Sequence, residues 1–178
     1  GPKALELAGR FADGCHTVMF TPDGFRHQLE HDHRGMDLGG RAPADVRVML
    51  VLPCCVLEDG DRARWLARHH LSFYLGGMGP YYRENLSRQG YGDVATDIAA
   101  RWADNDHAGA IEGISDDLLD DLAVAGTPAR VRSVLEQWEA IEGLDAIMVI
   151  FPVAADQDEI EATIEALAPN QRTDRSGR

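Results

Sequence analysis

Lysine is almost absent from this sequence, and positive charge is scarce altogether. The 178 residues contain 17 lysines and arginines against 30 aspartates and glutamates, which gives a formal net charge of −13. Lys3 is the only lysine. Proteins that bind nucleic acids or anionic membranes by electrostatic attraction need basic patches, so the composition argues against both kinds of partner.

Long apolar runs and paired cysteines are lacking as well. No stretch approaches the roughly 20 apolar residues of a membrane-spanning helix, and we expect neither a membrane segment nor a signal peptide. The cysteines number 3, which is odd. Cys54 and Cys55 are adjacent in an apolar segment, where neighbouring side chains of a strand point to opposite faces. We therefore expect reduced core thiols in a cytoplasmic protein.

The apolar segments that are present predict buried β-strands at residues 15–20, 46–57 and 146–151. Each strand is followed by a helical pattern, and this order favours parallel strands that are covered on both faces. Residues 81–125 predict a helical insert, and residues 169–178 a polar tail that we expect to be disordered. The sequence therefore predicts an α/β protein with a parallel sheet.

Threonine–proline pairs predict where two of the helices begin. Thr21-Pro22 and Thr127-Pro128 each combine an N-cap residue with a proline at the first helical position. Ser115 predicts a further cap, at the last helix of the insert.

Residues 27–31 (HQLEH) match the H-x-x-E-H arrangement of some zinc proteases, with two histidines one helical turn apart. No convincing third ligand accompanies them, because Glu84 and Glu112 are candidates by spacing only. We interpret the segment as a solvated helix face and expect no metal. The sequence also lacks a G-x-S-x-G motif, a C-x-x-C pair and a phosphate-binding P-loop.

Two further motifs have ordinary structural interpretations. His69 and His70 are adjacent on a predicted helix, so their side chains diverge by about 100° and cannot act as a pair. Core or surface placement is therefore favoured over a catalytic role. The glycine-rich loop at residues 76–79 lacks the spacing of a dinucleotide fingerprint and follows no strand. It is interpreted as a helix breaker, with close approach to a ligand as the alternative.

Paired aspartates and several tyrosines lie in or near the insert. We interpret the aspartates as a charged helix start with a solvated face rather than as metal ligands. The tyrosines are expected to pack the insert rather than to contact a cofactor ring. These residues are Asp116, Asp117, Asp120, Asp121, Tyr81, Tyr82 and Tyr91.

Several segments in sequence order resemble the C-terminal half of luciferase-like monooxygenases, in the branch that uses the deazaflavin coenzyme F420. They are residues 1–14 (GPKALELAGRFADG), 72–93 (SFYLGGMGPYYRENLSRQGYGD), 114–138 (ISDDLLDDLAVAGTPARVRSVLEQW) and 146–152 (AIMVIFP). The resemblance extends over residues 1–168. It implies a partial (β/α)8 TIM-type barrel in which the predicted strands are strands six, seven and eight. A complete barrel typically needs about 250 residues, so we expect the back half of an enzyme, without strands one to five.

The resemblance also implies a cofactor site. In the family, a Gly-Pro-Lys or Gly-Pro-Arg segment after strand five holds the cofactor phosphate with the start of a helix. A helix N-terminus suits this role, because it presents unpaired N–H groups and the positive end of the dipole. The loops after the later strands and the glycine-rich loop are expected near the cofactor. The implied cofactor-binding residues are Gly1, Pro2, Lys3, Phe20, Gly76, Gly77 and Gly79.

The function implied is that of an oxidoreductase or monooxygenase that transfers a hydride between coenzyme F420 and a small organic substrate, with FMN as the alternative cofactor. The acid–base residues are expected in the first half of the barrel, so none is assigned to this chain. A second hypothesis is a non-catalytic half-barrel that self-associates or binds a partner chain. An in-frame first half encoded upstream of Gly1 would favour the enzyme, and a start codon just before Gly1 the half-barrel.

The isolated chain is expected to form a homo-oligomer. Half of a barrel leaves apolar surfaces and unpaired strand edges that the chain cannot cover by itself. Light scattering at low micromolar concentration should therefore report a dimer or a larger species. A monomer under these conditions would refute the expectation.

Overall fold

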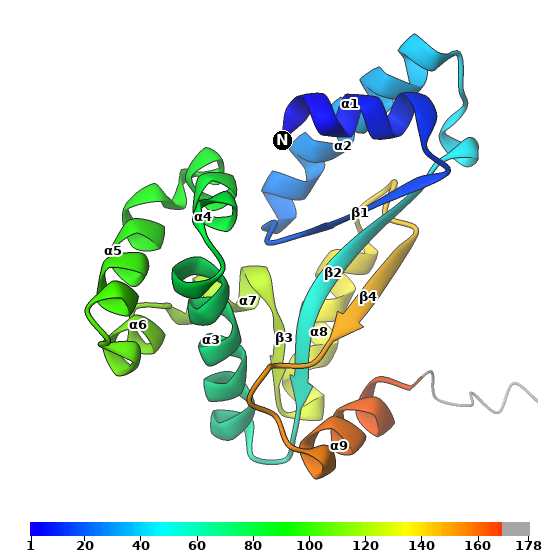
Figure 1. The fold of residues 1–178 in the computed structure, drawn as a ribbon. Coiled ribbons are helices and arrows are strands. Elements are labelled where there is room, and N and C mark those ends of the chain that lie inside the picture. Colours follow the sequence, from blue (N-terminus) through cyan, green and yellow to red (C-terminus); the bar gives the residue numbers. More distant parts are fainter. Residues whose placement is uncertain (169–178) are drawn as a thin grey trace, which may run out of the picture.

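The computed structural model describes residues 1–168, and the tail expected at 169–178 lies outside them. A parallel sheet organises the chain around its central strand β2 (Arg47–Val56), as Figure 1 shows. β1 (Gly14–Val18) and β4 (Ala146–Ile150) both pair with residues 49–51 of β2, so they lie on its opposite edges. Both pairings are parallel, which confirms the predicted parallel sheet. The prediction of buried strands is wrong for β4, which is largely exposed because no helix or further strand of residues 1–168 covers it on both faces.

A short fourth strand was not predicted. β3 (Val124–Gly126) pairs in parallel with Cys54–Val56 at the carboxyl end of β2. It occupies the last positions of the segment expected to be purely helical. A strand of 3 residues carries too few side chains to show an alternating or apolar pattern of its own.

Helices make up most of the remaining chain, and their starts agree with the predicted caps. The Thr21 hydroxyl accepts a hydrogen bond from Gly24 N at 3.1 Å, and Ser115 accepts one from Leu118 N at 3.2 Å. The Thr127 hydroxyl does the same for Arg130 N, at 3.4 Å. The helices are α1 (Pro2–Phe11), α2 (Pro22–Gly39), α3 (Gly60–Gly77), α4 (Pro80–Leu86), α5 (Gly92–Ala103), α6 (His107–Glu112), α7 (Asp116–Leu122), α8 (Pro128–Glu139) and α9 (Gln157–Leu167), together with a 3-10 turn η1 (Pro43–Asp45) and a π-helical turn η2 (Ser87–Tyr91).

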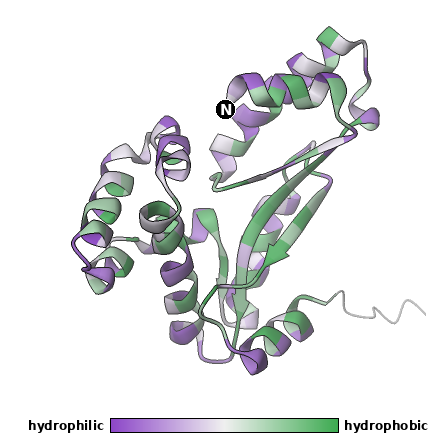
Figure 2. Ribbon diagram, in the orientation of Figure 1, coloured by the Kyte–Doolittle hydropathy of each residue, from purple (hydrophilic) through white to green (hydrophobic). Residues whose placement is uncertain are grey.

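One hydrophobic core lies between the sheet and the helices α2 and α8. Phe25 of α2 and Trp138 of α8 are fully buried and meet edge to face, with ring centroids 6.2 Å apart. They pack on every second residue of β2, including Leu50 and Leu52. Figure 2 shows the corresponding hydrophobic colour along the strands. α2 and α8 therefore cover the same face of the sheet.

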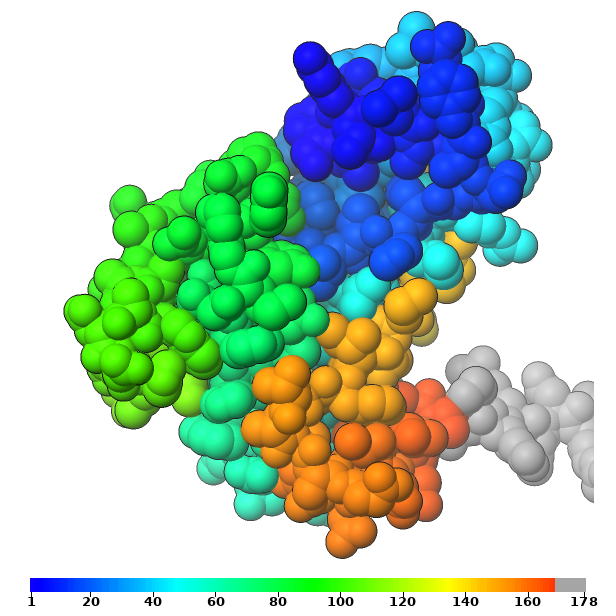
Figure 3. Space-filling model, viewed as in Figure 1, coloured from blue at the N-terminus to red at the C-terminus, as the bar shows by residue number. Residues whose placement is uncertain are grey.

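A second core belongs to a helical cluster formed by α3, α4, α5, α6 and α7. Leu71 and Leu75 of α3 share it with Leu86, Ile98 and Leu119 from the later helices. The first half of α3 instead packs against Cys55 of β2. The helical cluster thus begins earlier than the insert predicted for residues 81–125, and it forms the green lobe beside the sheet in Figure 3.

Helices α1 and α2 contact each other backbone to backbone. A Cβ atom at Gly9 would lie 2.1 Å from the carbonyl oxygen of Asp32, and one at Gly35 would lie 2.1 Å from that of Glu6. Only glycine allows such a close approach. An ion pair at 3.0 Å between Arg34 and Glu6 adds to the contact. Together these contacts determine where the start of α1 lies relative to α2.

No helix within residues 1–168 has the length and apolar character needed to cross a membrane.

Replacing Gly35 by alanine should force α1 and α2 apart. Overpacking of this kind typically costs about 1–3 kcal/mol, so the free energy of unfolding measured in urea should fall by that amount. Gly113→Ala is the matched control, because Gly113 has φ −64° and a Cβ there would lie no closer than 3.4 Å to other atoms. Equal stability of the Gly35→Ala and Gly113→Ala variants would contradict the glycine-mediated contact.

Candidate functional site

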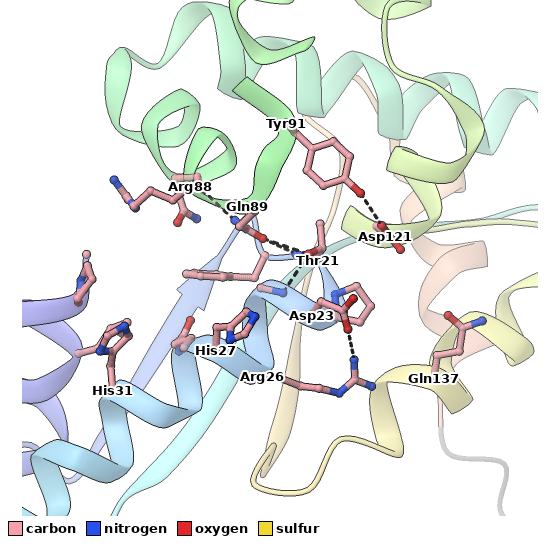
Figure 4. Close-up of a pocket in the computed structure, with 18 of the residues that line it drawn as sticks. Thr21, Asp23, Arg26, His27, His31, Arg88, Gln89, Tyr91, Asp121 and Gln137 are labelled. Carbon is pink, nitrogen blue, oxygen red and sulfur yellow. Dashed lines mark hydrogen bonds and ion pairs between the residues drawn. The ribbon is translucent and has the colours of Figure 1, made fainter. Parts of the chain in front are cut away.

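A cleft of about 810 Å³ opens next to the carboxyl end of β1, and its walls come from distant parts of the chain (Figure 4). The first turns of α1 and α2 form one side. The turn η2, the end of α7 and the second half of α8 form the other. Parallel α/β proteins bind their ligands beyond the carboxyl ends of the strands, so the cleft lies where a site is expected.

A hydrogen-bonded clamp joins the helical cluster to the connection between β1 and α2. Met19 follows β1 with φ +62°, an unusual conformation for a residue other than glycine. Its carbonyl oxygen accepts hydrogen bonds from the side-chain amides of Asn85 and Gln89, each at 2.9 Å. The Gln89 oxygen in turn accepts from Thr21 N at 2.9 Å. The clamp therefore holds both the strained residue and the N-cap of α2.

Gly24 makes room for this clamp. A Cβ atom at this position would lie 2.0 Å from the side-chain oxygen of Gln89. Any larger residue would push Gln89 away from the first turn of α2. The first turn of α2 and the Gln89 side chain therefore fit together only because residue 24 has no side chain.

Two helix starts and two arginines line the cleft. Gly1 and Pro2 bring the start of α1 to its wall, and Thr21 brings the start of α2. Arg88 and Arg26 line the cleft as well, and Arg26 is paired with Asp23 at 2.7 Å on the side of Gln137 (Figure 4). Two helix N-termini and guanidinium groups together favour a bound anion such as a phosphate.

Only some of the residues expected to bind the cofactor line the cleft. Gly1 and Pro2 line the cleft, and so does Phe20, which lies between β1 and the N-cap of α2. Lys3 is exposed and does not line the cleft. Its side chain leaves the first turn of α1 on another side of the helix.

The glycine-rich loop lies elsewhere. Gly76 and Gly77 are the last residues of α3, and a Cβ at Gly76 would lie 2.4 Å from Trp102 of α5. Gly79 has φ +89° and forms the turn into α4. None of these three glycines lines the cleft. In the structure they allow close packing of α3 on α5 and a sharp turn, as the helix-breaker interpretation predicted.

Tyr91 and Asp121 form a polar pair on the wall of the cleft that faces the first turn of α2 (Figure 4). The Tyr91 hydroxyl donates to Asp121 Oδ2 at 3.3 Å, and both side chains are half-buried. Burial raises the pKa of Asp121 above the usual range, and the nearby carboxylates of Asp23 and Asp117 raise it further. The pKa of Tyr91 is raised as well, first by burial and then by Asp121.

The interpretation of the aspartates as a solvated helix face was therefore too simple. Asp116 and Asp120 pair with Arg64 at 2.8 and 2.6 Å. Arg64 is almost fully buried and connects α3 to α7. Asp121 lies on the cleft side of the same helix. Helical spacing could have separated Asp121 from the exposed aspartates, because Asp121 follows the buried Leu118 by one turn and so lies on the packed side of α7.

The histidines of residues 27–31 are also at the cleft. His27 is exposed with Nδ1 3.6 Å from Glu30, and the Nδ1 of His31 lies 3.7 Å from Glu6 of α1. Within residues 1–168, no three His, Cys, Asp or Glu side chains are grouped to hold a metal ion.

His70 is placed in the core, as its position in the helix suggested. It is buried, stacks on Tyr74 with centroids 4.6 Å apart, and accepts a hydrogen bond from Val153 N at 3.3 Å. Burial lowers the pKa of His70 to about 4, so this imidazole is neutral at physiological pH.

Removing the clamp should destabilise the protein. Gln89→Ala leaves Thr21 N without this hydrogen-bond partner and removes one of the two donors to the Met19 carbonyl, which should lower the free energy of unfolding by about 1–3 kcal/mol in urea titrations. Gln89→Glu keeps an acceptor for Thr21 but places a carboxylate oxygen where the amide nitrogen donated to the Met19 carbonyl, so it should destabilise the protein as well. Gln157→Ala, on the exposed face of α9, serves as the control and should change stability by less than about 0.5 kcal/mol. An equally small effect of Gln89→Ala would contradict the clamp.

Comparison with known proteins gives one family. Residues 1–144 match the family model of luciferase-like monooxygenases. A 5,10-methylenetetrahydromethanopterin reductase of Archaeoglobus fulgidus is 24% identical over 159 residues, which are 88% of this chain and 48% of that protein.

Two solved structures show the same fold. The coenzyme F420 dependent tetrahydromethanopterin reductase from Methanopyrus kandleri has a TM-score of 0.74 at 22% identity, over 94% of this chain and 47% of that one. An F420-dependent secondary alcohol dehydrogenase in complex with an F420-acetone adduct has a TM-score of 0.61 at 16% identity, over 95% and 47% of the two chains. The present chain thus spans about half the length of each relative.

Proposed function

Because this chain belongs to the luciferase-like monooxygenase family, we propose that it forms part of an oxidoreductase that uses coenzyme F420. The proposed reaction moves a hydride between the cofactor and a small organic substrate. The names of the relatives support the choice of coenzyme F420 over FMN. The alternative, FMN, remains an outcome of the experiment below.

One observation carries this proposal, namely that the starts of α1 and α2 meet at a single cleft with Arg26 and Arg88. This set of groups fits the phosphate of the cofactor, because helix dipoles and guanidinium groups both favour an anion. Gly1 and Pro2 would hold the phosphate, and Phe20 would contribute an apolar wall. The positions of Lys3, Gly76, Gly77 and Gly79 do not support a role for them in binding the cofactor.

We further propose that β1, β2 and β4 are strands six, seven and eight of a (β/α)8 barrel. Their parallel pairing supports this assignment. Within residues 1–168, the outer edges of β1 and β4 have no partner strand, as expected where the neighbouring strands of a barrel would pair. The helical cluster would then stand at the carboxyl end of the barrel, where this fold places its active sites.

When bound, the cofactor supplies the chemistry, by accepting or donating a hydride at C5. The residues of this chain position and enclose the reactants. The clamp of Asn85 and Gln89 keeps the first turn of α2 in place, so this turn need not be ordered on binding. The turn η2, with Tyr91, forms one wall of the cleft.

The same free strand edges favour a second candidate function. A non-catalytic half-barrel would cover β1 or β4 by pairing with another copy or with a partner chain. Such a protein would lack the ring pocket that the other barrel strands provide. Binding of the cofactor therefore separates the two candidates.

Cofactor fluorescence should test the proposal. The phosphate contacts supply a few charge-assisted hydrogen bonds of about 1.5–3 kcal/mol each, whereas association alone costs at least about 4 kcal/mol. The isolated chain should therefore bind coenzyme F420 at millimolar levels or worse. A protein that also carries the preceding half of the barrel should bind it at micromolar levels and more tightly than FMN.

Substitution of a phosphate contact provides the control. In the larger protein, Arg88→Ala should weaken binding of coenzyme F420 about tenfold, because a charged hydrogen bond is lost. Arg132→Ala, on the exposed side of α8 and away from the cleft, should leave the affinity unchanged. Tight binding by the isolated chain, or a preference for FMN, would overturn the assignment.

A further inference from the structure

One side of α2 lines the cleft well beyond the first turn of the helix. Residues that recur there at intervals of three or four positions are Thr21, Gly24, Gln28 and His31 (Figure 4). We propose that Gln28 and His31 form a polar subsite for a hydroxyl group of the ligand, so that the phosphate bound in the cleft carries a short hydroxyl-bearing chain. The inference rests on the proposed function for the phosphate, and it adds the chemical class of the segment attached to it.

The side chain of Gln28 carries the inference. It is 2% exposed, and its amide nitrogen donates a hydrogen bond to Asp32 Oδ2 at 3.3 Å. Because the amide group is planar, its oxygen points away from that carboxylate. Within residues 1–168, this Oε1 atom is buried and accepts no hydrogen bond. An unpaired buried acceptor is unfavourable, so a ligand that brings an O–H or N–H donor to this wall is favoured.

Asp32 fixes the orientation of the Gln28 amide. Asp32 is fully buried, and its Oδ1 atom accepts a hydrogen bond from the Cys15 thiol at 3.5 Å. Rotating the amide by half a turn would bring its oxygen to Oδ2 and remove the donor from that atom. The amide nitrogen therefore stays on Asp32, and Oε1 is left for a ligand.

His31 contributes a second buried polar atom to the same wall. It follows Gln28 by three residues, so the two side chains are neighbours on the surface of α2. Its Nδ1 atom is buried, makes no hydrogen bond within residues 1–168 and lies 3.7 Å from Glu6 of α1. A hydroxyl group donates one hydrogen bond and can accept another, so it suits an amide oxygen and an imidazole nitrogen that are neighbours.

The position of the subsite limits the length of the chain that reaches it. Gln28 lies four residues after Gly24 of the first turn, which is about 6 Å along the axis of α2. The apolar side chains of Leu5 and Phe20 line the cleft as well. A phosphate at the start of α2 is therefore within reach of the subsite through a few carbon atoms, and the apolar side chains suit the C–H groups of such a chain.

The experiment compares two phosphate esters by NMR titration of the 178-residue chain. Methyl phosphate brings the anion alone, whereas glycerol phosphate adds hydroxyl groups on a short chain. We expect both esters to shift the backbone amides in the first turn of α2, and only glycerol phosphate to shift the side-chain amide resonances of Gln28. Glycerol phosphate should bind about tenfold more tightly, as expected when a buried acceptor gains a donor.

Gln28→Met removes the acceptor and keeps the length of the side chain. It should abolish the preference for glycerol phosphate and leave the affinity for methyl phosphate within about twofold. Gln157→Met, on the exposed face of α9, is the matched control and should retain the preference. If Gln28→Met fails to fold because Asp32 loses a donor, the comparison of the two esters on the unaltered chain decides, through the side-chain amide of Gln28.

Equal affinities of the two esters for the unaltered chain would overturn the inference. An unchanged preference in Gln28→Met, or binding of glycerol phosphate that leaves the side-chain resonances of Gln28 in place, would overturn it as well. Binding of methyl phosphate without a preference for glycerol phosphate would refute the hydroxyl subsite alone and leave the phosphate site standing. Absence of binding by both esters would refute the two together, so the failure of one proposal is distinguishable from the failure of the other.

Discussion

The arrangement of the cleft depends on the two amide side chains that reach from the helical cluster to the end of β1. Asn85 and Gln89 bind the Met19 carbonyl, and Gln89 also binds the N-cap residue of α2. These bonds hold a backbone conformation that is unfavourable in isolation. They also place η2, and with it Tyr91, opposite the start of α2. Without them, the two walls of the cleft would be joined only through the packing of apolar side chains.

The charge around the cleft depends on which acidic residues are paired with arginines. The chain is strongly acidic, yet Asp23 is paired with Arg26 of the same helix and Asp120 with Arg64 of α3. Arg64 forms ion pairs with Asp116 and Asp120 within the helical cluster. The walls of the cleft then carry the starts of α1 and α2 together with the carboxylate of Asp121, which pairs with no basic side chain within residues 1–168. Net charge alone therefore says little about the ligand that the cleft favours.

Local patterns in the sequence predicted much of the fold. The apolar segments and the threonine–proline caps act over a few residues, and the strands and helix starts agree with them. The amide clamp could not be predicted in this way, because Asn85 and Gln89 lie 66 and 70 residues from Met19 in the chain. The side of α7 that faces the cleft likewise follows from packing against α3 and η2. Gly1, Pro2 and Phe20 were expected through the family resemblance, and they do line the cleft.

The glycine contact between α1 and α2 has a consequence for how the cleft behaves on heating or on binding. No side chain lies between the two backbones at Gly9 and Gly35, so no rotamer change can alter their spacing. Side chains that order on folding lose conformational entropy, but this contact involves none. The two helix starts are therefore kept at a separation set by backbone stiffness. A ligand that spans the two helix starts must therefore match the distance between them, because its binding cannot change that distance.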